Sequence, residues 1–194
     1  MTPMAEEQPQ IRKEIVLKDG TRILVKKLSR GDGPALKEFN DTLSVPSKTF
    51  FNPHLYTDEI IAKVIERSEA DLDRSYVAWV ENQIIAYFFL WDMDTPTPLL
   101  GIGIRDDFQG QGLGRLLMEI LIEDAKNSLK DGIELTTMPG NDAAFNLYKK
   151  MGFVYVGDVD NEQADRTIVK ERRMFLSLRP GAKPLIKTFK PPVY

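Results

Sequence analysis

The stretch DDFQGQGLGRLLMEILIEDA, residues 106–125, decides the fold because it places three glycines within five positions, directly before an apolar-periodic run. From Leu113 onward, apolar residues recur at helical spacing, which predicts an amphipathic helix. Gly110, Gly112 and Gly114 therefore lie where this helix begins. A helix N-terminus leaves its first N–H groups unpaired and carries partial positive charge, and glycine lets the backbone approach a ligand closely. The stretch predicts an anion site whose natural ligand is a phosphate or pyrophosphate.

Two nucleotide-binding patterns with glycine-rich loops do not match this stretch. A Walker loop requires G-x-x-x-x-G-K-[ST], and no Lys-Ser or Lys-Thr pair follows the glycines. The dinucleotide fingerprint is G-x-G-x-x-G, whereas the spacing here is G-x-G-x-G. A nucleotide-binding protein is therefore disfavoured. The alternative that the glycines only form a tight corner between a strand and a helix stays open.

Patterns in the rest of the chain predict a mixed α/β fold. Residues 11–178 are expected to form a single domain, residues 1–10 a disordered-like end, and residues 179–194 an extended, basic, proline-rich tail. The segment 44–56 has two prolines and three aromatic residues, and we expect it to be irregular. Alternating or continuous apolar runs predict strands near 14–17, 21–28, 75–80, 84–91, 99–104, 133–138, 153–158 and 167–178, and helical spacing predicts helices near 32–43, 57–65, 113–125 and 141–151.

Composition excludes several classes of function. The 194 residues include 26 basic and 29 acidic side chains, so we expect no nucleic-acid partner. The chain has no cysteine and a single histidine, His54, which leaves little for a metal site or a catalytic triad, and we expect no metal. No apolar run approaches the roughly 20 residues of a membrane helix. The start MTPMAEEQPQ is not a secretory signal, so we expect a cytoplasmic protein without a membrane partner.

Two motifs carry a family resemblance. The turn Gln109-Gly110-Gln111-Gly112-Leu113-Gly114 matches the pattern Q/R-x-x-G-x-G/A, and NDAAFNLYKKMGF, residues 141–153, matches N-x-x-A-x-x-L-Y-x-K-x-G-F. One helix and one strand separate them. In these two motifs and in their separation, the chain resembles the GNAT superfamily of acyl-CoA-dependent N-acyltransferases. The resemblance implies a GNAT-like α/β fold (an α+β mixed sheet), with a central, mostly antiparallel sheet of about seven strands flanked by about four helices.

The resemblance also implies where acetyl-CoA binds. The turn from Gln109 to Gly114 would hold the pyrophosphate, and the strand around Ile102 and Ile104 would pair with the pantetheine arm. Gly101 and Gly103 suit such a close approach, and they also suit a β-bulge. The full set of expected coenzyme-binding residues is Ile102, Ile104, Gln109, Gly110, Gln111, Gly112, Leu113, Gly114, Asn141, Ala144 and Tyr148.

The implied reaction is transfer of an acetyl group to a primary amine by direct attack in a ternary complex. Tyr148 matches the family tyrosine that faces the coenzyme sulfur and would act as the general acid, although a core aromatic residue is an alternative explanation. The amine must lose a proton before it attacks. The segment PLLGIGI, residues 98–104, lacks the glutamate that many relatives carry there, and the remaining candidates for the base are Asp92, Asp94, Glu134 and His54. The base stays unassigned.

The acceptor is a small-molecule or protein amine that the sequence does not identify. Aromatic residues between the first helices either line its pocket or plug the edge of the sheet; they are Phe50, Phe51, His54 and Tyr56. A homodimer is possible through an edge strand at residues 167–178 together with the tail. A non-catalytic acyl-CoA-binding or sensory module on the same fold is the alternative function.

Overall fold

The structure is a computed structural model that describes residues 11–186 and 189–194, so the expected loose end at residues 1–10 lies outside it. Eight strands form one sheet in the order β1-β2-β3-β4-β5-β6-β8-β7, and only the β5–β6 pair is parallel. The predicted mixed, mostly antiparallel sheet is therefore confirmed. The strands are β1 (Ile11–Val16), β2 (Arg22–Lys27), β3 (Arg74–Val80), β4 (Gln83–Trp91), β5 (Leu99–Ile104), β6 (Gly132–Thr137), β7 (Val154–Glu162) and β8 (Ile168–Ser177).

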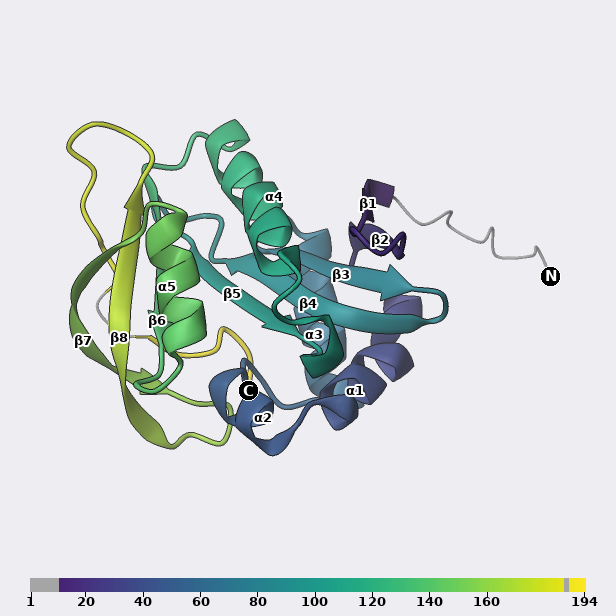
Figure 1. Cartoon of the computed structure of the whole chain (residues 1–194). Helices are drawn as coiled ribbons and strands as arrows, with labels where there is room; N and C mark the ends of the chain where they lie inside the picture. The colour runs from purple at the N-terminus through teal and green to yellow at the C-terminus, as the bar shows by residue number, and fades with distance from the viewer. Residues whose placement is uncertain (1–10, 187–188) are drawn as a thin grey trace.

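Helices cover both faces of the sheet (Figure 1). One apolar core lies between the sheet and α4 and α5, and a second lies between the sheet and α1 and α3. Strand β4 is buried from Ile84 to Trp91, as its continuous apolar sequence predicts. The α-helices are α1 (Gly33–Thr42), α2 (Val45–Phe50), α3 (Asp58–Glu69), α4 (Leu113–Asn127) and α5 (Asp142–Lys150). None of the helices in the described residues is long and apolar enough to cross a membrane.

Helix α2 corrects the prediction that residues 44–56 are irregular throughout. The Ser44 side chain accepts a hydrogen bond from the Ser47 backbone amide at 3.3 Å and so caps the helix. Pro46 lies in the first turn, where its missing N–H group would have no helical partner in any case. Proline here starts a short helix rather than preventing one.

Strands β5 and β6 separate almost immediately after they meet. Their ladder contains the single pair Leu99 and Glu134, whereas β4 and β5 pair continuously from Ala86–Ile104 to Trp91–Leu99. Beyond Leu99 the side of β5 that faces β6 is therefore left open. Helix α4 connects the two strands, and its N-terminus lies at the end of this opening (Figure 1).

The C-terminal residues pack against the sheet. The Glu134 carboxylate accepts hydrogen bonds from the backbone amides of Leu185 and Ile186 at 2.7 and 2.9 Å. Phe189 forms a parallel bridge with Asn161 on β7, and its side chain is buried. Strand β8 lies between β6 and β7, so the idea of a free edge at residues 167–178 is wrong: the sheet ends at β1 and β7.

Candidate active site

A cavity of about 460 Å³ lies where β5 and β6 separate. Its walls come from β5, the glycine turn, the start of α4, one side of α5, the end of β6 and helix α2. It brings together most of the coenzyme-binding residues predicted from the sequence, namely Ile102, Ile104, Gln109, Gly110, Gly112, Gly114, Asn141, Ala144 and Tyr148. The other polar residues of its lining are Ser47, Arg115, Thr136, Thr137 and Lys150. Of these, Lys150 stands in the second motif, and no role was predicted from the sequence for any of them.

Two predicted residues do not line this cavity. The exposed side chain of Gln111 turns back, and its Nε2 donates to the backbone oxygen of Asp107 at 2.8 Å. The side chain of Leu113 is fully buried in the core between α4 and the sheet. As the first residue of α4, Leu113 has only its backbone N–H group to offer a ligand.

The glycine turn has a left-handed backbone that favours glycine. Gly110 and Gly112 have φ angles of 73° and 84°, and a Cβ atom on either would meet nothing within 4 Å. Gly112 is the N-cap of α4, so no side chain caps this helix, and its first turn contains no acidic residue. Unpaired N–H groups at the start of a helix are able to bind an anion, so the predicted anion site stays a prediction. Arg115, whose side chain pairs with Glu119 at 2.9 Å, lies in the same lining.

Gly114 allows close packing at the corner between β5 and α4. A Cβ atom at this position would lie 3.0 Å from Leu147 Cδ2 and 3.4 Å from Ile104 Cδ1. The absence of a side chain therefore lets the start of α4 approach both α5 and β5. The alternative explanation of the glycines, a strand-to-helix corner, applies to Gly114 through its packing and to Gly110 and Gly112 through their left-handed φ angles, so it stays open beside the predicted anion site.

The open side of β5 presents backbone groups to the cavity. The Arg105 amide donates to Ile85 on β4 at 2.8 Å, and backbone groups alternate in direction along a strand. The N–H and C=O groups of Ile102 and Ile104 therefore point away from β4 and into the opening. The Ile104 oxygen accepts a bond from Gln109 Nε2 at 2.8 Å, which ties the glycine turn to the strand.

Gly101 and Gly103 make room for aromatic rings. A Cβ atom on Gly101 would lie 2.1 Å from Phe89 Cζ, and one on Gly103 would lie 2.2 Å from Phe51 Cδ1. The β4–β5 ladder, which the structure describes in full, runs through both positions without a bulge. Gly103 thus allows Phe51 to form a wall of the cavity. The alternative of a β-bulge, which these glycines also suit, is wrong.

Tyr148 lies on α5 at the border between the core and the cavity. The residue is 7% exposed and belongs both to the core and to the lining of the cavity. It is therefore a core aromatic residue, and its role as general acid stays a prediction. Burial, with a smaller contribution from the negative charge of Glu171, raises the pKa of the Tyr148 hydroxyl above its ordinary value. The hydroxyl is therefore protonated at neutral pH. Asn141 caps the same helix, accepting from the Ala144 amide at 3.4 Å.

Helix α2 is held against the glycine turn by a carboxylate. Asp106 accepts hydrogen bonds from the backbone amide and hydroxyl of Ser44, at 2.9 and 2.7 Å, and from the hydroxyl of Ser47 at 2.7 Å. These bonds lower the pKa of Asp106. The contact fixes α2 so that Phe50 and Phe51 lie at the cavity.

None of the four predicted candidates for the general base lines this cavity. His54 is fully buried, with Nε2 3.2 Å from the Tyr87 hydroxyl, and burial lowers its pKa to about 4. Glu134 is buried beneath the C-terminal residues and paired with Arg173. Asp92 pairs with Arg67 at 2.9 Å, and Asp94 is exposed on the loop after β4. No candidate is placed to take a proton from an amine in the cavity.

A second, smaller cavity of about 90 Å³ adjoins the first. The two share Phe50, Phe51 and Thr136, so two of the four aromatic residues predicted for the acceptor pocket line both. His54 and Tyr56 line neither, because they pack into the core between the sheet and the first helices. The polar residues of the second cavity are Asn52, Thr136, Asn161, Glu162, Gln163, Glu171 and Lys190. Glu171 stands in the charged run KERR, where nothing in the sequence marks it as buried.

Comparison with known proteins identifies a family for this chain. Residues 37–153 match the model of the acetyltransferase (GNAT) family. The curated "Uncharacterized N-acetyltransferase YvbK" of Bacillus subtilis (strain 168) is 28% identical over 96 residues, which are 49% of this chain and 59% of that relative's length.

Solved structures show the same fold. The ribosomal-protein-S5-alanine acetyltransferase from Vibrio fischeri superposes with a TM-score of 0.71 at 13% identity, covering 89% of this chain and 100% of that chain. The spermidine N-acetyltransferase from Vibrio cholerae, solved in complex with CoA and spermine, gives a TM-score of 0.64 at 20% identity, covering 80% and 95%.

Proposed function

The chain belongs to the acetyltransferase (GNAT) family, and we propose that it is an N-acetyltransferase that moves an acetyl group from acetyl-CoA directly to a primary amine. The observation that carries the proposal is the continuity of the large cavity. It runs from the left-handed glycine turn along the open side of β5 to Tyr148. An anion site, a strand edge and a proton donor thus follow one another in a single space.

The residues of this cavity suit the parts of acetyl-CoA. The free N–H groups at the start of α4 would bind the pyrophosphate, and the side chains of Arg115 and Lys150 add positive charge to the same lining. The backbone of Ile102 would pair with the amide groups of the pantetheine arm. Acetyl-CoA supplies the acetyl group as a thioester, and transfer of this group to an amine needs no metal.

Tyr148 would act as the general acid. The nitrogen–carbon bond forms as the carbon–sulfur bond breaks, and Tyr148 gives its proton to the departing sulfur. The nitrogen loses its own protons to solvent, from which Tyr148 is reprotonated. Direct transfer agrees with the composition, because the sequence has no cysteine to carry an acyl group.

A non-catalytic acyl-CoA-binding module is the second candidate. The observation that favours it is that, among residues 11–186 and 189–194, no carboxylate or histidine lines the large cavity, so these residues supply no base for the amine there. Such a module would keep the glycine turn, whereas its Tyr148 would be dispensable. The two candidates therefore differ in their response to substitution of Tyr148.

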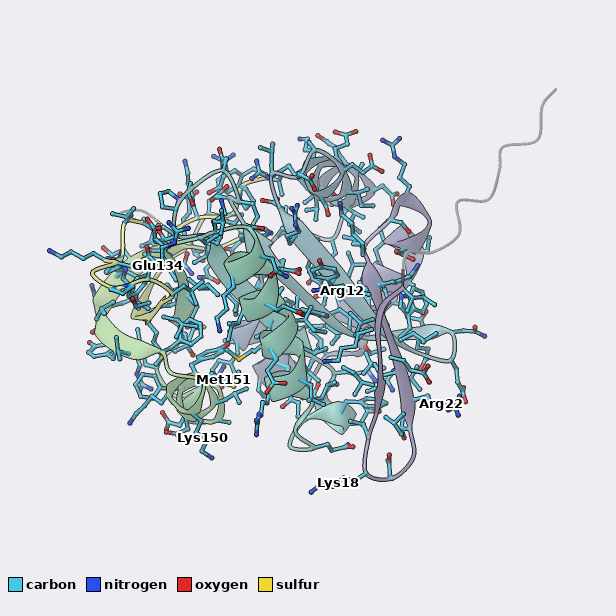
Figure 2. All side chains as sticks on the ribbon, turned by 90° about the horizontal axis from the view of Figure 1, so that it is seen from above. Arg12, Lys18, Arg22, Glu134, Lys150 and Met151 are labelled. Carbon is cyan, nitrogen blue, oxygen red and sulfur yellow. The ribbon has the colours of Figure 1, made fainter. Side chains whose placement is uncertain are left out.

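Calorimetric titration of acetyl-CoA into three proteins tests the proposal: the wild type, Gly112→Val and Gly20→Val. Gly20 is a matched control because its φ angle is 89° and a Cβ atom there also meets nothing within 4 Å. It lies in the β1–β2 hairpin between Lys18 and Arg22, well apart from the side of the molecule that carries Lys150 (Figure 2).

We expect the wild type and Gly20→Val to bind acetyl-CoA equally and Gly112→Val to bind at least tenfold more weakly, because both substitutions strain a left-handed turn and only one lies in the cavity. Release of free thiol with a panel of primary amines would then establish catalysis. Absence of binding to the wild type at millimolar acetyl-CoA contradicts the proposal. Binding without thiol release for any amine favours the non-catalytic module.

A further inference from the structure

Among the described residues, every buried carboxylate except one forms an ion pair with a lysine or arginine. Five are buried, and four of them form ion pairs: Asp32 with Lys26, Asp73 with Arg67, Asp124 with Arg12, and Glu134 with Arg173. The fifth, Glu171 on β8, is 5% exposed, and no lysine or arginine within residues 11–186 and 189–194 lies within 4.0 Å of its carboxylate oxygens. Its hydrogen-bond partner is the side-chain amide of Gln163, at 2.9 Å.

A buried negative charge without a cation is costly, and a protein keeps such a group at low cost only if something else neutralises it. Glu171 lines the second cavity together with the carboxylate of Glu162 and the ammonium group of Lys190, so acidic side chains outnumber basic ones in this lining, and Lys190 does not form an ion pair with Glu171. The cation that Glu171 lacks can therefore come from a ligand in this space. The aromatic rings of Phe50 and Trp91, in the same lining, favour an organic cation over a hydrated metal ion.

The position of this cavity relates it to the reaction. It shares Phe50, Phe51 and Thr136 with the large cavity, and the charge of Glu171 reaches far enough to raise the pKa of Tyr148. The second cavity is thus next to the place where the thioester would lie, yet outside the space that suits the coenzyme. An acceptor amine must bind at such a position to attack the thioester.

The size of the cavity limits what it can hold. Its volume of about 90 Å³ equals the share of about three water molecules in the liquid. This is room for the end of an alkyl chain but not for a folded segment of a protein. Lys190 and Pro191, from the C-terminal residues that run beside α2, form part of the wall (Figure 1).

We infer that the second cavity binds the acceptor as a primary alkylammonium group, with Glu171 as its counter-ion. The inference rests on the proposed function and deepens it by naming the chemical class of the acceptor. The family model does not cover the residues on which the inference depends. Glu162, Glu171 and the C-terminal wall all lie outside the matched segment 37–153. A free alkylamine and the end of a lysine side chain share this chemistry.

Binding of simple probes to the coenzyme-A-bound protein tests the inference. The probes are n-butylamine, its neutral analogue n-butanol, and Nα-acetyl-lysine amide, and the readouts are calorimetry and tryptophan fluorescence, since Trp91 lines the cavity. The proteins are the wild type, Glu171→Gln and the control Asp160→Asn, which removes an exposed carboxylate from the same hairpin, where it pairs with Lys170.

We expect the wild type and Asp160→Asn to bind n-butylamine alike, and Glu171→Gln to bind it at least tenfold more weakly with n-butanol binding unchanged. Equal binding of the two amines assigns the site to alkylammonium groups in general, and stronger binding of Nα-acetyl-lysine amide assigns it to a lysine residue. We also expect Glu171→Gln to raise the denaturant midpoint, because it removes a buried, uncompensated charge.

Coenzyme binding is measured in the same samples, so its absence counts against the proposed function and not against this inference. With coenzyme bound, wild-type affinity of Glu171→Gln for n-butylamine would overturn the inference. So would failure of the wild type to distinguish n-butylamine from n-butanol.

Discussion

The ring of Phe51 occupies the space where a side chain on Gly103 would begin, since a Cβ atom there would lie 2.2 Å from Phe51 Cδ1. Phe51 immediately follows α2, and Gly103 lies on β5, so the contact joins the helix that Asp106 anchors to the strand that borders both cavities. The position of this ring therefore depends on a glycine about 50 residues away in sequence.

Gly103→Ala should displace the Phe51 ring and disturb both cavities. Overpacking of this kind costs roughly 1–3 kcal/mol of stability, and we expect the KM for acetyl-CoA to rise about tenfold as well. Steady-state kinetics with a denaturant titration measure the two effects. Gly31→Ala is the matched control, because a Cβ atom on Gly31 meets nothing within 4 Å. The double variant Gly103→Ala/Phe51→Ala should relieve the clash, and additive losses in that variant would contradict the explanation.

Tyr148→Phe should lower kcat by about 10²–10⁴-fold and leave acetyl-CoA affinity within twofold of the wild type, because the substitution removes a proton donor and keeps the ring. Tyr155→Phe, which alters an exposed hydroxyl on β7, serves as the control. Because the pKa of Tyr148 is raised, its ionisation should not reduce wild-type kcat between pH 7 and about 9. Wild-type turnover in Tyr148→Phe would assign the acid to another group.

The local part of the site could be predicted from the sequence, because its requirements are local. A left-handed backbone favours glycine at positions 110 and 112, and an asparagine at position 141 caps a helix whose apolar spacing is visible. The alternation of backbone direction along β5 then decides that Ile102 and Ile104 point into the opening. The first two inferences need no contact between distant segments, and the third needs only the pairing of β5 with the preceding strand, β4.

Helix α2 and the burial of two glutamates could not be predicted, because they depend on contacts between residues that are distant in sequence. Helix α2 is anchored by Asp106, about 60 residues further on, so the two prolines of segment 44–56 alone indicated a loop. Glu171 stands among charged neighbours on its strand, whereas Glu134 stands between Ile133 and Leu135. The C-terminal residues cover Glu134, and β7 pairs with the strand that carries Glu171. The structure was needed to separate these two glutamates from ordinary exposed ones.

His54 should make the protein less stable in mild acid. Its pKa is about 4 in the folded protein and about 6.5 when unfolded, so the unfolded chain binds a proton that the folded chain excludes. The stabilisation is complete above pH 6.5 and is lost as the pH falls towards 4, and the loss between pH 7 and pH 5 is about 2 kcal/mol. Urea titrations at these two pH values measure it. In His54→Gln the difference should shrink by that amount, and an unchanged difference would assign the acid sensitivity to carboxylates.

Glu134→Ala should release the C-terminal residues from the sheet. The buried carboxylate accepts bonds from Arg173, from the Thr97 hydroxyl and from the amides of Leu185 and Ile186, so its removal leaves a cation and three donors unpaired. Breaking a buried ion pair in this way costs about 3–5 kcal/mol. Hydrogen exchange at the two amides should accelerate at least 100-fold.

The consequence for activity follows from the wall of the second cavity. Lys190 and Pro191 belong to that wall and not to the large cavity, so Glu134→Ala should change the KM for the amine more than the KM for acetyl-CoA. Glu69→Ala, which breaks the exposed pair with Arg30, is the control and should cost at most about 1 kcal/mol without affecting either KM. If exchange accelerates in Glu134→Ala while both KM values stay constant, the C-terminal wall has no part in acceptor binding.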